Sequence, residues 1–212
     1  MLASTQMDGC DSSLLIIFLK APRVGLVKTR LAVALGADAA CLAYRRLVET
    51  LLERLTELDC IQLRFTPDEA ATEMERWRRG SWTLARQGSG DLGARLQQAF
   101  HEAFAAGWKR VVIIGSDCPY ILASDIKMAW ALLEKTEVVL GPAQDGGYWL
   151  VGLRTERREL FDGIPWSTDA VFEQTLKRCR LGGWSVQSLR ELIDVDTIEQ
   201  WQAFMENDQE VD

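Results

Sequence analysis

The chain has 212 residues, of which 48% are hydrophobic and 26% are charged. This length and composition suit one globular domain with a substantial core. The formal net charge of -7 argues against general binding of nucleic acid, which requires a basic surface. A few lysines and arginines gathered in one cleft can still attract a small anionic ligand.

The cysteines and the first apolar segment predict where the protein works. The five cysteines are widely scattered, no two have the spacing of a zinc or redox site, and their odd number without a secretion signal predicts reduced thiols in the cytoplasm. The apolar run 14–19 is too short to cross a bilayer, and acidic residues precede it where a signal peptide carries positive charge. We expect no membrane association.

In chain order, a small, polar tail at residues 1–13 precedes one domain at residues 14–212. Apolar runs predict strands, and periodic segments predict helices between them. The expected strands cover 14–19, 60–65, 82–86, 110–115, 137–141, 148–153 and 185–189. The expected helices run from Gly36 to about Leu58, after Pro67, over 94–107, from a cap at Ser124, over about 168–180, and through the last segment after Asp194.

This alternation predicts an α/β fold with a mostly parallel central sheet and helices on both faces. The run 148–153 follows a short turn, which favours an antiparallel pairing. Ligands of such sheets bind beyond the carboxyl ends of the strands. The chemically rich segments of this sequence all fall just after strands.

The first of these segments is a basic loop after the strand at 14–19. It contains Lys20, Pro22, Arg23, Gly25, Lys28 and Arg30. Backbone N–H groups at a helix start, joined by Lys28 and Arg30, suit a nucleotide phosphate group. No Walker pattern is present. The alternative is an ordinary basic surface loop.

Carboxylates follow two later segments. Asp117 ends the strand at 110–115 and is a suitable hard ligand for Mg or Mn, or else the side chain of an Asx turn. Asp194 and Asp196 alternate in an extended stretch, so they face the same side and can complete a metal site. Alternatively, Asp196 or Thr197 caps the last helix.

Three glycine-rich or polar turns are weaker candidates. Asp145, Gly146, Gly147 and Tyr148 form a turn in which backbone can approach a ligand and Asp145 can act as a base; the alternative is a plain tight turn. Asp91, Gly93 and Arg95 open a helix and can contact the ribose, base or phosphate. The remaining turn, a candidate wall for the acceptor, contains Trp166, Ser167 and Thr168.

The sequence offers no serine or cysteine nucleophile with a histidine partner. His101, the only histidine, lies in the middle of a predicted helix and is interpreted as a surface or packing residue. The eight tryptophans are dispersed and are interpreted as packing residues. The chemistry therefore has to come from positioning and charge.

Together these segments resemble the GT-A-like glycosyltransferases of the nucleotide-diphospho-sugar transferase superfamily, of the radical-SAM/selenodomain-associated type. The resemblance is carried, from residue 16 to about residue 200, by the strings IIFLKAPRVGLVKTRLA, GSGDLGARL, VVIIGSDCP, VVLGPAQDGGYWLVGL, IPWST and DVDT. More distantly, the chain is similar to phospholactate guanylyltransferases and to molybdenum-cofactor nucleotidyltransferases.

The resemblance implies a GT-A-like, Rossmann-like fold with the nucleotide across the carboxyl edge of the sheet. It implies that Lys28 contacts phosphate, that Asp117 binds the metal, and that Asp194 and Asp196 are metal partners. The pair Ser116-Asp117 departs from a literal DxD motif. This departure leaves the construction of the metal site open.

Three functions follow as hypotheses. The first is glycosyl transfer from a nucleotide-diphospho-sugar to a small-molecule acceptor, with Lys28, Asp117 and Asp145 as catalytic residues. The second is nucleotidyl transfer from an NTP, which releases pyrophosphate. The third is a nucleotide-binding sensor without turnover. The expected partners are the nucleotide and the acceptor, in a monomer or homodimer that binds neither nucleic acid nor a membrane.

Overall fold

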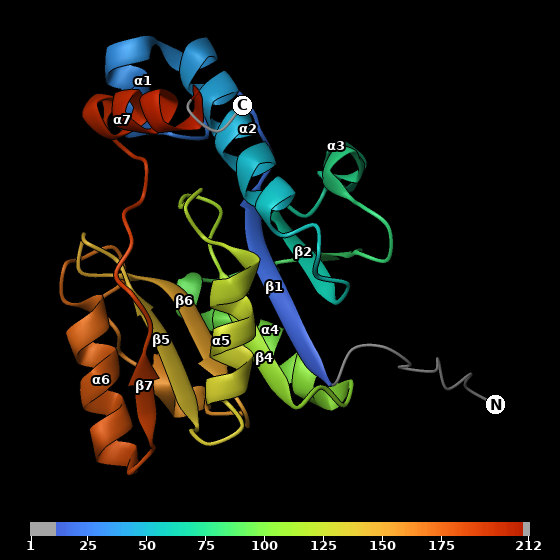
Figure 1. Cartoon of the computed structure of the whole chain (residues 1–212), viewed down its shortest axis with the longest axis vertical. Helices are drawn as coiled ribbons and strands as arrows, with labels where there is room; N and C mark the ends of the chain where they lie inside the picture. The colour runs from blue at the N-terminus through green and yellow to red at the C-terminus, as the bar shows by residue number, and fades with distance from the viewer. Residues whose placement is uncertain (1–11, 210–212) are drawn as a thin grey trace.

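The computed structural model describes residues 12–209, which form a seven-stranded sheet with helices packed around it (Figure 1). Of the tail expected at residues 1–13, all but the last two residues lie outside this range. The strands are β1 (Ser13–Lys20), β2 (Ile61–Thr66), β3 (Thr83–Arg86), β4 (Arg110–Ile114), β5 (Val138–Pro142), β6 (Tyr148–Leu153) and β7 (Val186–Ser188).

The strand order is β3-β2-β1-β4-β6-β5-β7. All neighbouring pairs are parallel except those of β6, which runs antiparallel to both β4 and β5. The short turn between β5 and β6 leaves no room for a crossover helix, so the chain reverses direction there. The predicted mostly parallel sheet is confirmed, and its antiparallel strand is the expected one.

The helices alternate with the strands along the chain. They are α1 (Thr29–Leu35), α2 (Ala37–Arg54), α3 (Ala71–Met74), α4 (Leu92–Ala105), α5 (Ala123–Leu132), α6 (Val171–Gly182) and α7 (Ile198–Gln209), with short 3-10 turns η1 (Glu75–Trp77) and η2 (Arg158–Phe161).

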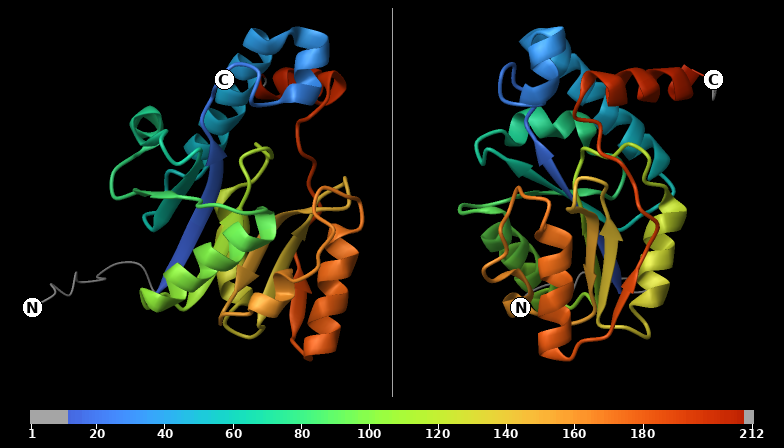
Figure 2. Two further views of the ribbon diagram at one scale, coloured as in Figure 1. Left: turned by 180° about the vertical axis from the view of Figure 1, so that it is seen from behind. Right: turned by 90° about the vertical axis from the view of Figure 1, so that its left-hand side faces the viewer.

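Two apolar clusters fill the two faces of the sheet. Successive side chains of β1 alternate between the clusters, because a strand points its side chains to opposite faces in turn. Helices α2, α3 and α5 cover one face, and α4, α6 and η2 cover the other. Seen along the sheet in Figure 2, α5 in yellow and α6 in orange lie on opposite sides. The predicted helices on both faces are confirmed.

A smaller layer lies beyond the carboxyl end of β1, where α1 and α7 pack against the first half of α2 (Figure 1). Its centre holds the buried side chains of Leu31, Leu47 and Phe204. The last helix therefore returns to the segment that follows the first strand. This return brings residues near position 196 to residues near position 28.

Several predicted helix limits are wrong. Helix α5 begins after Leu122 rather than at a Ser124 cap, because the Asp125 carboxylate accepts the Leu122 N–H at 2.8 Å. Helix α6 begins at Val171 instead of about Thr168. Helix α7, by contrast, begins at Ile198 directly after the extended stretch that the sequence predicts for Asp194 and Asp196. The segment after Pro67 forms only the four-residue helix α3 and the turn η1.

The cysteines agree with the expectation of reduced thiols in three cases. Cys41, Cys118 and Cys179 are free and buried. Cys60 departs from it, because this residue is disulfide-bonded. Within residues 12–209, no helix has the length and apolar character needed to cross a membrane.

One buried hydroxyl joins three elements of the fold. The Tyr44 hydroxyl of α2 accepts the backbone N–H of Lys20 at 2.8 Å and contacts the Ser116 hydroxyl at 3.1 Å. It also lies 3.1 Å from the Lys20 carbonyl oxygen, to which it can donate. Burial and the nearby Asp117 carboxylate raise the pKa of Tyr44 well above its usual range, so the hydroxyl keeps its proton. The ends of β1 and β4 are thereby held to α2.

We expect Tyr44→Phe to lower the free energy of unfolding by about 1–3 kcal/mol, because it leaves buried polar groups without their partner. Urea denaturation measures the change. Tyr120→Phe is the matched control, since Phe keeps the ring contact of Tyr120 with Phe204. Equal effects of the two substitutions would contradict the anchoring role of Tyr44.

Candidate functional site

A cavity of about 620 Å³ lies at the carboxyl edge of the parallel strands, beside α1. Residues from the ends of β1 and β4 and from the loops before β6, α6 and α7 meet there. Its lining consists of Lys20, Val27, Lys28, Thr29, Arg30, Tyr44, Leu92, Asp117, Asp145, Gly147, Tyr148, Trp166, Ser167, Thr168, Asp169, Val171, Asp194 and Asp196.

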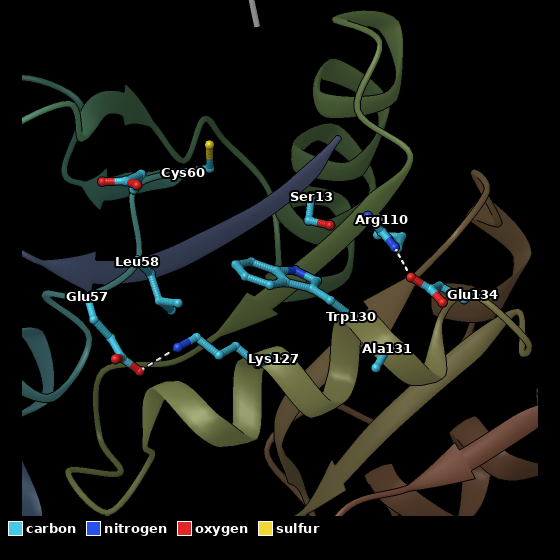
Figure 3. Close-up of a pocket in the computed structure, with 10 residues that line it drawn as sticks. Ser13, Glu57, Leu58, Cys60, Arg110, Lys127, Trp130, Ala131 and Glu134 are labelled. Carbon is cyan, nitrogen blue, oxygen red and sulfur yellow. Dashed lines mark hydrogen bonds and ion pairs between the residues drawn. The ribbon is translucent and has the colours of Figure 1, made fainter. Parts of the chain in front are cut away.

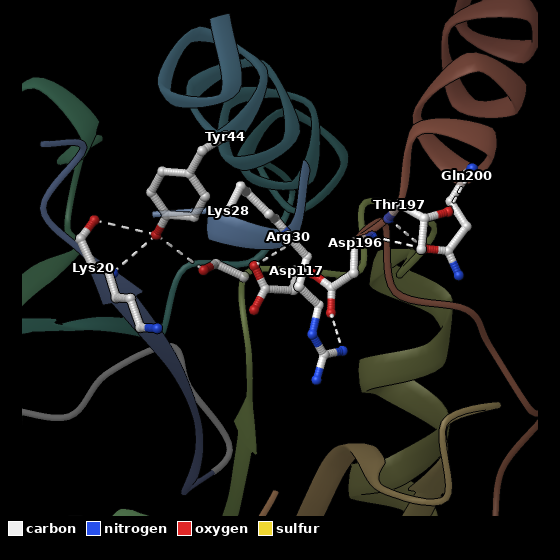
Figure 4. A network of polar contacts seen from close by, with 9 residues as sticks. Lys20, Lys28, Arg30, Tyr44, Asp117, Asp196, Thr197 and Gln200 are labelled. Carbon is white, nitrogen blue, oxygen red and sulfur yellow. Dashed lines mark hydrogen bonds and ion pairs between the residues drawn. The ribbon is translucent and has the colours of Figure 1, made fainter. Parts of the chain in front are cut away.

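The centre of this cavity is a buried lysine between two carboxylates (Figure 4). The Lys28 Nζ atom lies 2.7 Å from Asp117 Oδ1 and 2.9 Å from Asp196 Oδ1. The lysine side chain is only 2% exposed, whereas Asp117 is 48% exposed and Asp196 is 34% exposed. The ammonium is thus held inside the protein, whereas both carboxylates are accessible to solvent.

The charge of Lys28 is secured by this pairing. Burial alone would lower the pKa of the ammonium, but the carboxylates of Asp117 and Asp196 more than offset this, and the pKa is raised. The lysine therefore stays positive throughout the neutral range. The two carboxylates in turn neutralise this fixed positive charge at the cavity.

The backbone of Lys28 is as unusual as its side chain. With φ of 47° it adopts the left-handed conformation and forms the N-cap of α1. Among the non-glycine residues of the described range, only Ser12, Lys28 and Ser167 have positive φ, and the last two line the cavity. Such backbone costs of order 1 kcal/mol or more and gathers at functional sites.

The extended segment before α7 delivers two further carboxylates. Val195, buried between Asp194 and Asp196, donates its backbone N–H to the Asp117 carbonyl at 3.0 Å. Upstream, Leu192 pairs with Ala143 in a parallel bridge. Because the segment continues along the edge of β5 toward β4, both aspartates reach the cavity.

The pKa of the Asp194 carboxyl reflects its burial among the other carboxylates. Burial, followed by the carboxylates of Asp117, Asp145 and Asp196, raises its pKa to about 7, although Lys28 partly opposes this. Near neutral pH this carboxyl is therefore partly protonated. The site carries more negative charge than its own cations neutralise.

The start of α7 is capped without using the Asp196 side chain. The Gln200 side-chain oxygen accepts the N–H groups of Asp196 and Thr197, each at 2.8 Å, and Thr197 Oγ1 accepts the Gln200 N–H at 3.4 Å. This reciprocal arrangement is a capping box. Asp196 is consequently free to contact Lys28, and its Oδ2 also lies 3.8 Å from Arg30 Nη1.

The opposite wall is built from two loops in close contact. Asp145 Oδ1 accepts the Gly147 N–H at 2.9 Å, which shapes the turn before β6. At Gly146 a β-carbon would collide with the Asp169 backbone, so only glycine allows this approach. The rings of Tyr148 and Trp166 pack edge to face, with their centroids 6.4 Å apart. This side of the cavity therefore combines aromatic rings with carboxylates.

Some candidate residues of the basic loop lie away from the cavity. The Arg23 guanidinium pairs with Glu69 at 3.0 Å and with Glu73 at 2.7 Å. The Pro22 carbonyl accepts the Cys41 thiol at 3.1 Å. Pro22, Arg23 and Gly25 do not line the cavity, whereas Lys20, Lys28 and Arg30 do.

The candidates at the start of α4 have structural partners. Asp91 caps the helix by accepting the Ala94 N–H at 2.9 Å. Arg95 donates to the Gly90 carbonyl at 3.0 Å and to the Gln87 side chain at 3.2 Å. Gly93 allows close packing, since a β-carbon there would lie 2.7 Å from the Trp166 indole nitrogen. Like Gly146, these three residues do not line the cavity.

The sequence candidates did not include six residues of the cavity: Val27, Thr29, Tyr44, Leu92, Asp169 and Val171. Tyr44 looks in sequence like part of the apolar stripe of its helix, so nothing there distinguishes it. Leu92 has an apolar side chain, so its position in the sequence does not suggest a functional role. Asp169 follows the candidates Ser167 and Thr168 directly, and a carboxylate in that loop is a signal that could have been used.

The charge of the cavity bears on metal binding. Five carboxylates and three cations line it. Within residues 12–209, no group of three or more His, Cys, Asp or Glu side chains is arranged to hold a metal ion. The donors nevertheless have suitable chemistry, because carboxylate oxygens are the ligands that Mg prefers, and Mg commonly uses only one or two of them beside substrate phosphates. The surplus negative charge also favours a cation.

A second cavity lies at the opposite, amino edge of the sheet, between the starts of β1 and β4 and helix α5 (Figure 3). Its volume is about 310 Å³. Both cations of this cavity are paired with carboxylates, Lys127 with Glu57 at 2.8 Å and Arg110 with Glu134 at 2.5 Å.

A family model described as "Uncharacterized protein conserved in bacteria (DUF2064)" matches residues 51–168. Among solved structures, one from Desulfovibrio desulfuricans G20, provisionally named a nucleotide-diphospho-sugar transferase, is 31% identical with a TM-score of 0.84. The alignment covers 93% of this chain and 96% of that chain. No curated protein matches the chain.

More distant structures share the fold alone. A 4-diphosphocytidyl-2C-methyl-D-erythritol synthase from Anaerococcus prevotii is 12% identical with a TM-score of 0.59, and the alignment covers 92% of this chain and all of that one. A CMP:2-keto-3-deoxy-manno-octonic acid synthetase complexed with CTP is 11% identical with a TM-score of 0.57, over 92% and 99% of the two chains.

Removing the buried ammonium should destabilise the site. We expect Lys28→Met to lower the free energy of unfolding by about 1–3 kcal/mol in urea denaturation, because carboxylates then face one another without a cation. Arg30→Met is the matched control: its side chain is 76% exposed, and a change within about 0.5 kcal/mol is expected. Equal losses in the two variants would contradict the central role of Lys28.

Proposed function

We propose that this chain, which belongs to the bacterial family whose model it matches, is a transferase that uses a nucleotide-bound donor, and that it transfers a glycosyl group from a nucleotide-diphospho-sugar to a small acceptor. The 31% identical structure, provisionally named a nucleotide-diphospho-sugar transferase, aligns with almost the whole chain. The proposal depends on one observation above all: Lys28 is held between carboxylates of two distant segments at the carboxyl edge of the sheet.

The phosphates of the donor would lie against the cations of this cavity. Lys28 supplies a positive charge whose position is fixed by burial. The side chains of Arg30 and Lys20 are more exposed, so they can change conformation to contact the ligand. Arginine suits phosphate because its guanidinium can donate two parallel hydrogen bonds. The nucleotide would thus be oriented with its diphosphate toward β1 and α1.

Charge balance supports a divalent metal, Mg or Mn, bound together with the donor. Five carboxylates already outnumber three cations, and a diphosphate adds further negative charge. Asp117, Asp194 and Asp196 would hold the ion, which would neutralise charge on the departing diphosphate. Since no preformed cluster of three ligands exists in residues 12–209, binding of the ion should depend on the nucleotide.

The acceptor would approach from the wall that contains Asp145, Tyr148 and Trp166. Its hydroxyl oxygen forms a bond to the sugar carbon while the bond from that carbon to the diphosphate oxygen breaks. The acceptor proton passes to the Asp145 carboxylate, and the nucleoside diphosphate leaves. No protein nucleophile is required, because positioning and charge neutralisation carry the reaction.

The reaction type can be read from its products. Incubation of the protein with a panel of sugar nucleotides and NTPs, together with Mn and candidate acceptors, should release a nucleoside diphosphate. Release of pyrophosphate would instead identify nucleotidyl transfer. Binding of a nucleotide without any product would identify a sensor, and the glycosyl proposal would then be rejected.

Nucleotide binding and metal binding should depend on each other. In calorimetric titrations we expect Mn to bind at least tenfold more tightly when the nucleotide is present, and Asp117→Asn to remove this coupling while the fold is retained. Asp162→Asn is the matched control, since Asp162 accepts a hydrogen bond from Gln97 and does not line the cavity. Unchanged coupling in Asp117→Asn would count against the assigned ligand.

A further inference from the structure

An apolar recess of about 120 Å³ adjoins the candidate active site. It lies between α4 and the strands β4 and β6, and its lining includes Phe18, Leu96, Ile113 and Val151. Leu96, Ile113 and Val151 are at most 3% exposed. The walls are therefore rigid parts of the core rather than mobile loops.

The recess and the large cavity share two lining residues, Leu92 and Tyr148. Leu92, the first residue of α4, is 44% exposed, which is unusual for a large apolar side chain. Because Leu92 and Tyr148 line both spaces, the two spaces adjoin at these side chains. A molecule bound in the large cavity can consequently extend a substituent past Leu92 and Tyr148.

Gly115 forms part of the recess at the end of β4, two residues before Asp117. A β-carbon added at this glycine would meet no atom within 4 Å. Its φ lies outside the left-handed region, so a larger residue introduces no backbone strain there. The glycine thus leaves open a space that a side chain would otherwise occupy.

We infer that the acceptor carries a short apolar substituent that enters this recess. This inference rests on the proposed transferase function and names the acceptor class for the same site. The lining side chains are apolar apart from the Tyr148 hydroxyl and the Trp149 indole nitrogen, so a hydroxylated group would replace few of its hydrogen bonds to water. An alkyl group gains about 25 cal/mol for each Å² that it buries.

The volume limits the size of the substituent. An engineered cavity of roughly 150 Å³ lined by apolar residues stays dry and binds benzene. The recess, at about 120 Å³, suits a branched alkyl group slightly smaller than a benzene ring. The expected acceptor therefore combines a reactive hydroxyl with a short alkyl end, rather than being a second sugar.

Isobutanol is a probe for this recess, and glycerol is its polar match of similar size. We expect isobutanol to shift the NMR signals of the Leu96, Ile113 and Val151 methyl groups in a saturable manner, whereas glycerol does not. Gly115→Val should weaken isobutanol binding at least tenfold, and Gly115→Ala should weaken it less. Ala106→Val adds two of the three carbons that Gly115→Val adds, at an exposed position, and should have no effect.

Nucleotide binding in the presence of Mn, measured on the same variants, separates this inference from the proposed function. Wild-type protein and Gly115→Val should bind nucleotide alike. Isobutanol binding that does not saturate, or that is unchanged in Gly115→Val, would overturn the acceptor inference alone. Failure of the wild-type protein to bind any nucleotide would overturn the proposed function, and with it the assignment of the recess to an acceptor.

Discussion

The arrangement of the candidate site depends on one buried ammonium. Lys28 emerges from a left-handed N-cap and lies within 3 Å of carboxylates from the end of β4 and from the segment before α7. A buried charge is tolerated only when it is paired, so lysine and carboxylates require one another. This contact joins three segments that are far apart in the sequence.

Much of the fold could be predicted from local patterns. The runs LLIIFL and RVVII are apolar and β-branched, and both are central strands of the sheet. The turn between β5 and β6 is too short for a crossover, and the antiparallel pairing of β6 follows from that. Helix ends were predicted less well, because caps such as Asp125 act through contacts that composition does not reveal.

Part of the site could be predicted from charged residues in the loops that follow strands. Lys28, Asp117, Asp145, Asp194 and Asp196 stand out because charged residues next to buried strands are expected at the sheet edge, and the structure gathers them around one cavity. Arg23 has the same sequence context but pairs with Glu69 and Glu73, whose positions depend on α3. The role of Tyr44 could not be predicted from the sequence, because its hydroxyl finds its hydrogen-bond partners only when α2 packs against β1.

The central claim is that this gathered charge binds the phosphates of a nucleotide. The most direct measurement is a crystal structure of the protein soaked with a nucleoside diphosphate and Mn. The account predicts phosphate oxygens in contact with Lys28 and Arg30, and the ion between those oxygens and Asp117. Nucleotide bound elsewhere, for example in the cavity beside Trp130, with the lysine and its two carboxylates untouched, would contradict it.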